Sequence, residues 1–170
     1  MPDHLTQKIR ATGSWEGAVA SCELSYDARF LRRKVVQTTD GQSVLIDLEH
    51  TTSLNHGEAM ETSEGALIAI VAASEELLEI KGDNLVQLAW HIGNRHTPCQ
   101  IEDDHLLIQN DPVIGHMLEH LGASVAPVDR PFTPEGGAYG HGRTHSHEHG
   151  ATAHDHDHSH PHSHDHSHAD

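Results

Sequence analysis

The C-terminal segment limits what this chain can fold into more than any other feature. Twelve of the last thirty residues are histidine, and the chain from His141 reads HGRTHSHEHGATAHDHDHSHPHSHDHSHAD. Asp, Ser or Gly usually separates one histidine from the next. A segment with so few apolar side chains cannot form a core, so we predict a disordered tail over residues 136–170. About 135 residues remain for the folded part, which is enough for two small domains.

The histidines of this tail predict metal binding. Neutral imidazole is a favoured ligand of Zn(II), Cu(II) and Ni(II). Residues i and i+2 of an extended chain point the same way about 6.6–7 Å apart, so a kink can close two imidazoles on one ion. A segment without a role and a purification tag remain alternatives, although tags are usually uninterrupted histidine runs. The predicted ligands are His141, His145, His147, His149, His154, His156, His158, His160, His162, His164, His166 and His168.

Charge excludes two classes of partner. Ten basic residues stand against 26 acidic ones, and the formal charge is −16 with every histidine neutral. This balance argues against nucleic acid and against anionic membrane surfaces. The N-terminus MPDHLTQKIR has no apolar segment typical of a secretory signal, and no run of 18 apolar residues occurs. We therefore expect a cytoplasmic protein whose Cys22 and Cys99 are reduced.

Residues 1–72 predict an all-β domain. The apolar pairs around Val35 and Leu45 flank Asp40-Gly41, a dipeptide typical of hairpin turns. The segments 18–24 and 67–72 predict further short strands. Because no helical period interrupts them, we expect a small sandwich or barrel-like unit.

Residues 73–135 predict a ferredoxin-like domain with the order β-α-β-β-α-β. A strand at 77–80 precedes a helix that Asp83 or Asn84 can cap and that Gly93 or Asn94 can close. Two short strands follow, at 99–102 and 105–109. The next helix has clear limits, with Asp111 as N-cap, Pro112 in the first turn and Gly122 at the end. The apolar positions predicted for this helix are Val113, Ile114, Met117, Leu118 and Leu121, and a last strand spans 124–129.

Three side chains with metal-ligand chemistry lie close together in HIGNRHTPCQIE. They are His91, His96 and Cys99. His96 falls after the predicted end of the helix, on a loop before Pro98. On spacing alone the indication is weak, because a lone loop histidine is more often simply exposed and a cysteine at a strand start is more often a small buried residue.

A second histidine pair, His116 and His120, stands one helical turn apart in the second predicted helix. Such an i, i+4 pair can bind a metal, although Met117 rather than Glu follows the first histidine, so this is no H-E-x-x-H motif. We expect both to face solvent. The histidines expected to be isolated surface residues are His4, His50, His56 and His105.

The folded part resembles a known family. The stretch WHIGNRH, the helix pattern D-P-V-x-x-x-M-L-x-x-L-G and the histidine-rich C-terminus look like the urease accessory nickel metallochaperones, UreE. The upstream stretches TTDGQSVLIDL and EGALIAIVAASEELLEI are similar to the β-domain of that family. The resemblance covers essentially residues 5–170.

The resemblance implies a non-enzymatic function. It implies a homodimer formed through the ferredoxin-like domains, with one Ni(II) as cargo held across the two-fold axis by His96 of both chains. It implies that the tail histidines complete or feed this site, and that Zn(II) or Cu(II) can substitute in vitro. The implied partners are the urease apoprotein and urease accessory proteins including a GTPase, with docking to the β-domain. Some relatives carry an H-x-H pair before the second helix. Here that stretch is Asn110-Asp111-Pro112, which leaves Asp111 as a weak oxygen donor.

Two other functions stay open. A storage or buffering protein for Ni or Zn would need only the tail, whereas a carrier needs an ordered site that a partner can approach. A metal-dependent hydrolase is disfavoured, because the sequence of the folded part lacks a cluster of three histidines or carboxylates around an activated water.

Overall fold

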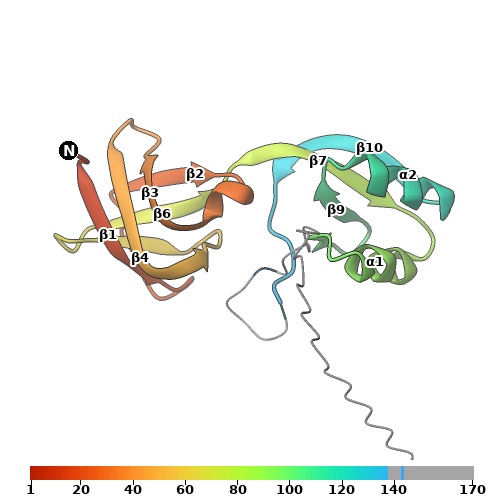
Figure 1. Ribbon diagram of the computed structural model, residues 1–170, viewed down its shortest axis with the longest axis horizontal. Coiled ribbons are helices and arrows are strands. Elements are labelled where there is room, and N and C mark those ends of the chain that lie inside the picture. Colours follow the sequence, from red (N-terminus) through yellow and green to blue (C-terminus); the bar gives the residue numbers. More distant parts are fainter. Residues whose placement is uncertain (138–142, 144–170) are drawn as a thin grey trace, which may run out of the picture.

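The computed structural model describes residues 1–137 and Arg143, and these residues form mainly strands with two helices (Figure 1). Figure 1 shows two separate sheets joined by the long strand β7, with β10 returning beside it. No helix of the described part is long and apolar enough to span a membrane. The elements are β1 (His4–Arg10), β2 (Ala20–Leu24), the 3-10 helix η1 (Asp27–Arg29), β3 (Phe30–Gln37), β4 (Ser43–Ser53), β5 (Ala59–Thr62), β6 (Leu67–Ala72), β7 (Ser74–Lys81), α1 (Leu85–Asn94), β8 (Gln100–Ile101), β9 (Leu106–Gln109), α2 (Pro112–His120) and β10 (Ser124–Pro131).

The N-terminal sheet has six strands in the order β2-β6-β5-β1-β4-β3. The predicted hairpin is confirmed, since β3 and β4 pair antiparallel with Val35 opposite Leu45. Two pairings are parallel, β1 with β4 and β2 with β6, and these join strands far apart in sequence. The sheet curls so that its edge strands β2 and β3 come close together. Thr39, just after β3, donates its N–H to the carbonyl of Ser21 in β2 over 2.8 Å. The enclosed core includes Cys22, Val44, Ile46, Met60, Ile68 and Ile70.

The C-terminal sheet has four strands in the order β10-β7-β9-β8, and all its pairings are antiparallel. The predicted element order β-α-β-β-α-β is confirmed. Both helices cover one face, because Leu88 and Ile92 of α1 share a buried cluster with Ile114 and Leu118 of α2. Gly115 lets α2 approach the sheet, since a Cβ there would lie 3.0 Å from Leu78 Cδ1.

The helix starts agree with the sequence, whereas the predicted apolar face of α2 and the predicted cap of α1 differ in part from the structure. Asn84 accepts from Gln87 N–H, and Asp111 accepts from two backbone N–H groups in the first turn of α2. Gly93, however, lies inside α1 rather than at its end. Val113 was expected on the apolar face of α2 but is 78% exposed. It occupies the first turn of the helix.

A buried arginine joins the two sheets. Arg29 is only 2% exposed. Its guanidinium donates to the carbonyls of Leu24 (2.8 Å), Leu54 (3.2 Å) and Phe132 (2.5 Å). Phe132 follows β10 and is itself fully buried, with its ring edge-on to that of Tyr26 at 5.3 Å. The segment after β10 therefore seals the junction between the sheets.

Candidate metal site

His96 occupies an unusual backbone position at the end of α1. Its φ is 54°, the only positive φ at a non-glycine residue in the described chain. Thr97 N–H bonds to the Ile92 carbonyl over 3.3 Å and His96 N–H to the Gly93 carbonyl over 3.0 Å. These two bonds define a Schellman cap with His96 at the position that most often holds glycine. The helix ends at Asn94, one of the two residues predicted to close it, but the left-handed residue of the cap is His96.

The other helix shows the usual solution for the same cap. At the end of α2, Ala123 N–H bonds to the Leu118 carbonyl and Gly122 N–H to the Glu119 carbonyl, each over 3.0 Å. Gly122 has φ of 90°. A side chain in this left-handed conformation costs about 1 kcal/mol, a cost that glycine avoids. Backbone strain of this kind concentrates at functional sites, so the conformation of His96 supports a role for its imidazole.

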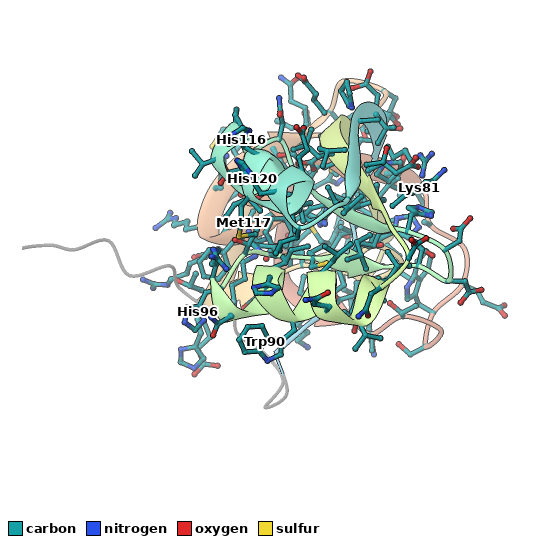
Figure 2. The ribbon with its side chains drawn as sticks, turned by 90° about the vertical axis from the view of Figure 1, so that its right-hand side faces the viewer. Lys81, Trp90, His96, His116, Met117 and His120 are labelled. Atoms are coloured by element: carbon teal, nitrogen blue, oxygen red, sulfur yellow. The ribbon has the colours of Figure 1, made fainter. Side chains whose placement is uncertain are left out.

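His96 lines a cleft of about 780 Å³ between the two sheets. One wall is formed by residues 52–56, at the end of β4 and in the loop that follows it, and the other by the end of α1 and the residues after it. Residues 133–137 and Arg143 complete the lining. Figure 2 shows His96 at the end of α1, away from the His116 and His120 pair on α2. The imidazole is exposed, so a partner or a ligand from solvent can reach it.

Arg143 is the one described residue of the histidine-rich segment, and it is firmly held. Its guanidinium stacks on the Tyr26 ring with 3.5 Å to the centroid. It donates to the Tyr26 carbonyl and to Ser53 Oγ, the latter over 3.1 Å. Asp27 adds an ion pair at 4.0 Å, and the side chain is 11% exposed. Arg143 and His96 line the same cleft, although no pattern in the sequence singles out Arg143.

Cys99 also lines the cleft, as a free thiol that is partly buried. The side chain packs partly buried against the core below α1 and α2. Burial raises the pKa of the Cys99 thiol to about 11, and the nearby Glu135 carboxylate adds to the rise. Because the thiolate is the metal-binding form, this raised pKa adds a proton-release cost to metal binding by Cys99. Cys22 is likewise a buried free thiol, in the other sheet.

We expect the variant Cys99→Ala to keep the tight metal affinity of the protein to within about twofold, because the partly buried thiol must lose its proton at a raised pKa before it can bind an ion. The measurement is a Ni(II) titration at pH 7.5 of the full chain and the variant. A tenfold weaker affinity in Cys99→Ala would make Cys99 a ligand.

The remaining histidines of the folded part are spread out. His91 lies in the last turn of α1, beside Trp90, and does not line the cleft. His105 was expected to be an isolated surface residue, which is wrong. Its side chain is 16% exposed, and its ring contacts Asp104 at 2.6 Å and Arg130 at 3.1 Å. His56 lines the cleft, where its Nδ1 accepts from Ala72 N–H over 3.1 Å.

The predicted i, i+4 pair comes together on α2. His116 and His120 are both exposed, with 3.2 Å between their Nε2 atoms. Asp111 uses its carboxylate to cap α2. Across residues 1–137 and Arg143, no three His, Cys, Asp or Glu side chains are grouped so that they could hold an ion. The predicted tail ligands from His141 to His168 lie outside the described residues.

Comparison with known proteins gives one consistent match. Residues 3–73 match the family model for the N-terminal domain of the UreE urease accessory protein, and residues 75–168 match the model for its C-terminal domain. The chain is 59% identical over 136 residues to urease accessory protein UreE of Ruegeria pomeroyi, which covers 80% of this chain and 91% of that protein. It is 48% identical over 141 residues to the protein of the same name from Rhodobacter capsulatus, which covers 83% of this chain and 90% of that one.

Proposed function

The chain belongs to the UreE family of urease accessory proteins, which have a role in urease maturation, and from this premise we propose that it binds Ni(II) and delivers it to apo-urease. The ion is cargo. The residue that we propose to hold it is His96, and the observation that carries this assignment is the strained left-handed backbone of His96 at the mouth of the cleft.

We propose that two chains share the ion. One exposed imidazole is a weak site, but a two-fold axis beside His96 would place a second imidazole opposite the first. The outer surface of α1 supports such a contact, because Val86 is 83% and Trp90 is 62% exposed. These side chains are four residues apart and so lie on the same face of the helix. Ile101 of β8, 52% exposed, adds further apolar surface.

The tail histidines would supply the remaining ligands and collect ions from solution. This step is supported by Arg143, which lies in the histidine-rich segment and lines the same cleft as His96. The Arg143 contacts with Tyr26, Asp27 and Ser53 hold this one residue against the N-terminal part of the chain. Imidazole suits Ni(II), Zn(II) and Cu(II) alike, so Zn(II) and Cu(II) would also bind in vitro.

The alternative, a buffer for Ni or Zn, needs the tail alone. The observation that favours a carrier is that His96 belongs to the ordered part of the chain and keeps a backbone conformation that glycine would adopt at lower cost. A buffer gives no reason for a histidine at that position.

The test is activation of apo-urease together with its accessory proteins, including the GTPase. We expect the Ni(II)-loaded chain to activate urease when a chelator removes free Ni(II), and the variant His96→Gly with its tail intact to lose most of that activation. The variant His50→Ala, which changes an exposed histidine of β4 that does not line the cleft, is the control. Equal activation by His96→Gly and the unchanged chain would support the buffer instead.

A further inference from the structure

His116 and His120 bring two imidazoles together on α2, away from the cleft that His96 lines. Both residues lie on α2, whose hydrogen-bonded turns place positions i and i+4 on one face. The rings are 4.6 Å apart between centroids, with an angle of 83° between their planes. Figure 2 shows them beside each other on α2. Their neighbour Met117 packs against the core instead.

The separation of the two nitrogens suits one metal ion. His116 Nε2 and His120 Nε2 are 3.2 Å apart. An ion about 2.1 Å from each nitrogen, the usual bond length to imidazole, would see them at an angle of about 100°. This angle lies between those of adjacent ligands in octahedral and in tetrahedral coordination. The helix thus holds two ligands in place before the ion arrives.

We propose that His116 and His120 chelate a divalent transition-metal ion on the surface of α2, independently of the His96 site. Both side chains are exposed, so the ion is reached directly from solvent. Water would fill the other coordination positions, since no third His, Cys, Asp or Glu of the described chain joins the pair. Such a site exchanges its ion readily and leaves positions open to a ligand from another molecule.

The neutral alternative is a hydrogen bond between the two imidazoles, in which one Nε2–H donates to the other ring. Metal binding requires lone pairs on both Nε2 atoms, so each ring would carry its proton on Nδ1 instead. The metal chelate and the hydrogen-bonded pair differ in how removal of one ring changes metal binding at the other. For the chelate, loss of one imidazole weakens metal binding at the other by roughly 10²-fold, because the second contact is intramolecular.

The test is histidine footprinting with diethyl pyrocarbonate on the full chain, read by mass spectrometry of separate peptides so that the tail does not obscure α2. The probe is Ni(II) alone, raised beyond the capacity of the tail. We expect His116 and His120 to become protected together, at a lower Ni(II) concentration than the isolated His50. In His116→Ala the Ni(II) concentration that half-protects His120 should rise roughly 10²-fold. The control His50→Ala should leave it unchanged.

Two results would overturn the proposal. One is half-protection of His120 at the same Ni(II) concentration in His116→Ala and in the unchanged chain. The other is protection of the pair only at the concentration that protects His50. The bonded ring of His105 reports on folding, since it should resist modification in every variant. The variant His96→Gly should protect the pair normally, so failure of the proposed delivery function would not affect this result.

Discussion

Replacement of His96 by glycine is expected to abolish tight Ni(II) binding while stabilising the folded protein. The imidazole is lost, so the affinity of the tight site should fall by at least about 10²-fold. The left-handed backbone at φ of 54° no longer carries a Cβ, so the free energy of unfolding should rise by up to about 1 kcal/mol. The variant should therefore lose metal affinity and gain stability. Because the two effects have opposite signs, a weaker affinity cannot be explained by a less stable fold.

Two measurements check this expectation. Ni(II) titration, with a chelator that keeps the tail empty, gives the affinity, and denaturant unfolding of the metal-free protein gives the stability. The matched variant His96→Ala removes the imidazole but keeps a Cβ, so it should lose the tight site without gaining stability. A His96→Gly protein that is less stable than His96→Ala would contradict the assigned backbone strain.

Replacement of Arg29 by methionine is expected to destabilise the protein by about 3 kcal/mol. Methionine keeps much of the volume but removes the donors, so the carbonyls of Leu54 and Phe132 lose their guanidinium partner at a buried junction, while the Leu24 carbonyl keeps only its bond from Ala73 N–H. Burial lowers the pKa of the Arg29 guanidinium, and the nearby Glu75 carboxylate partly opposes that fall. The measurement is the midpoint of denaturant unfolding for metal-free protein.

The matched control for Arg29 is Arg33→Met in the neighbouring strand β3. Arg33 is 68% exposed and pairs with Asp47 only at 4.0 Å, so its loss should change stability by no more than about 0.5 kcal/mol. Similar midpoints for Arg29→Met and Arg33→Met would show that the junction between the sheets does not depend on Arg29.

Local signals in the sequence were sufficient for much of the fold. The Asp40-Gly41 turn, the Asp111-Pro112 helix start and the strand at 67–72 follow from neighbouring residues, and the structure has all three. Strands β1 and β5 went unpredicted, because β1 pairs in parallel with β4 some forty residues away and β5 is only four residues long. Pairing over such distances leaves no local pattern to detect.

The candidate site was predictable only in part. The sequence singled out His96, but the expected helix end at Gly93 or Asn94 hid its left-handed backbone, since glycine and asparagine are the usual residues there. Arg29 stands three residues before the exposed, charged run Arg32-Arg33-Lys34, so its sequence context is that of a surface residue. Only the folded structure shows that three carbonyls accept hydrogen bonds from it. Arg143 was not predicted either, because its partners Tyr26 and Ser53 are distant from it in sequence.

Native mass spectrometry of the full chain, with less than one Ni(II) per two chains, tests most directly whether two His96 side chains share one ion. We predict a dimer that retains one ion when a chelator has emptied the tail, and a His96→Gly dimer that retains none. Retention of the ion by His96→Gly, or by single chains of the unchanged protein, would contradict a site shared by two His96 side chains.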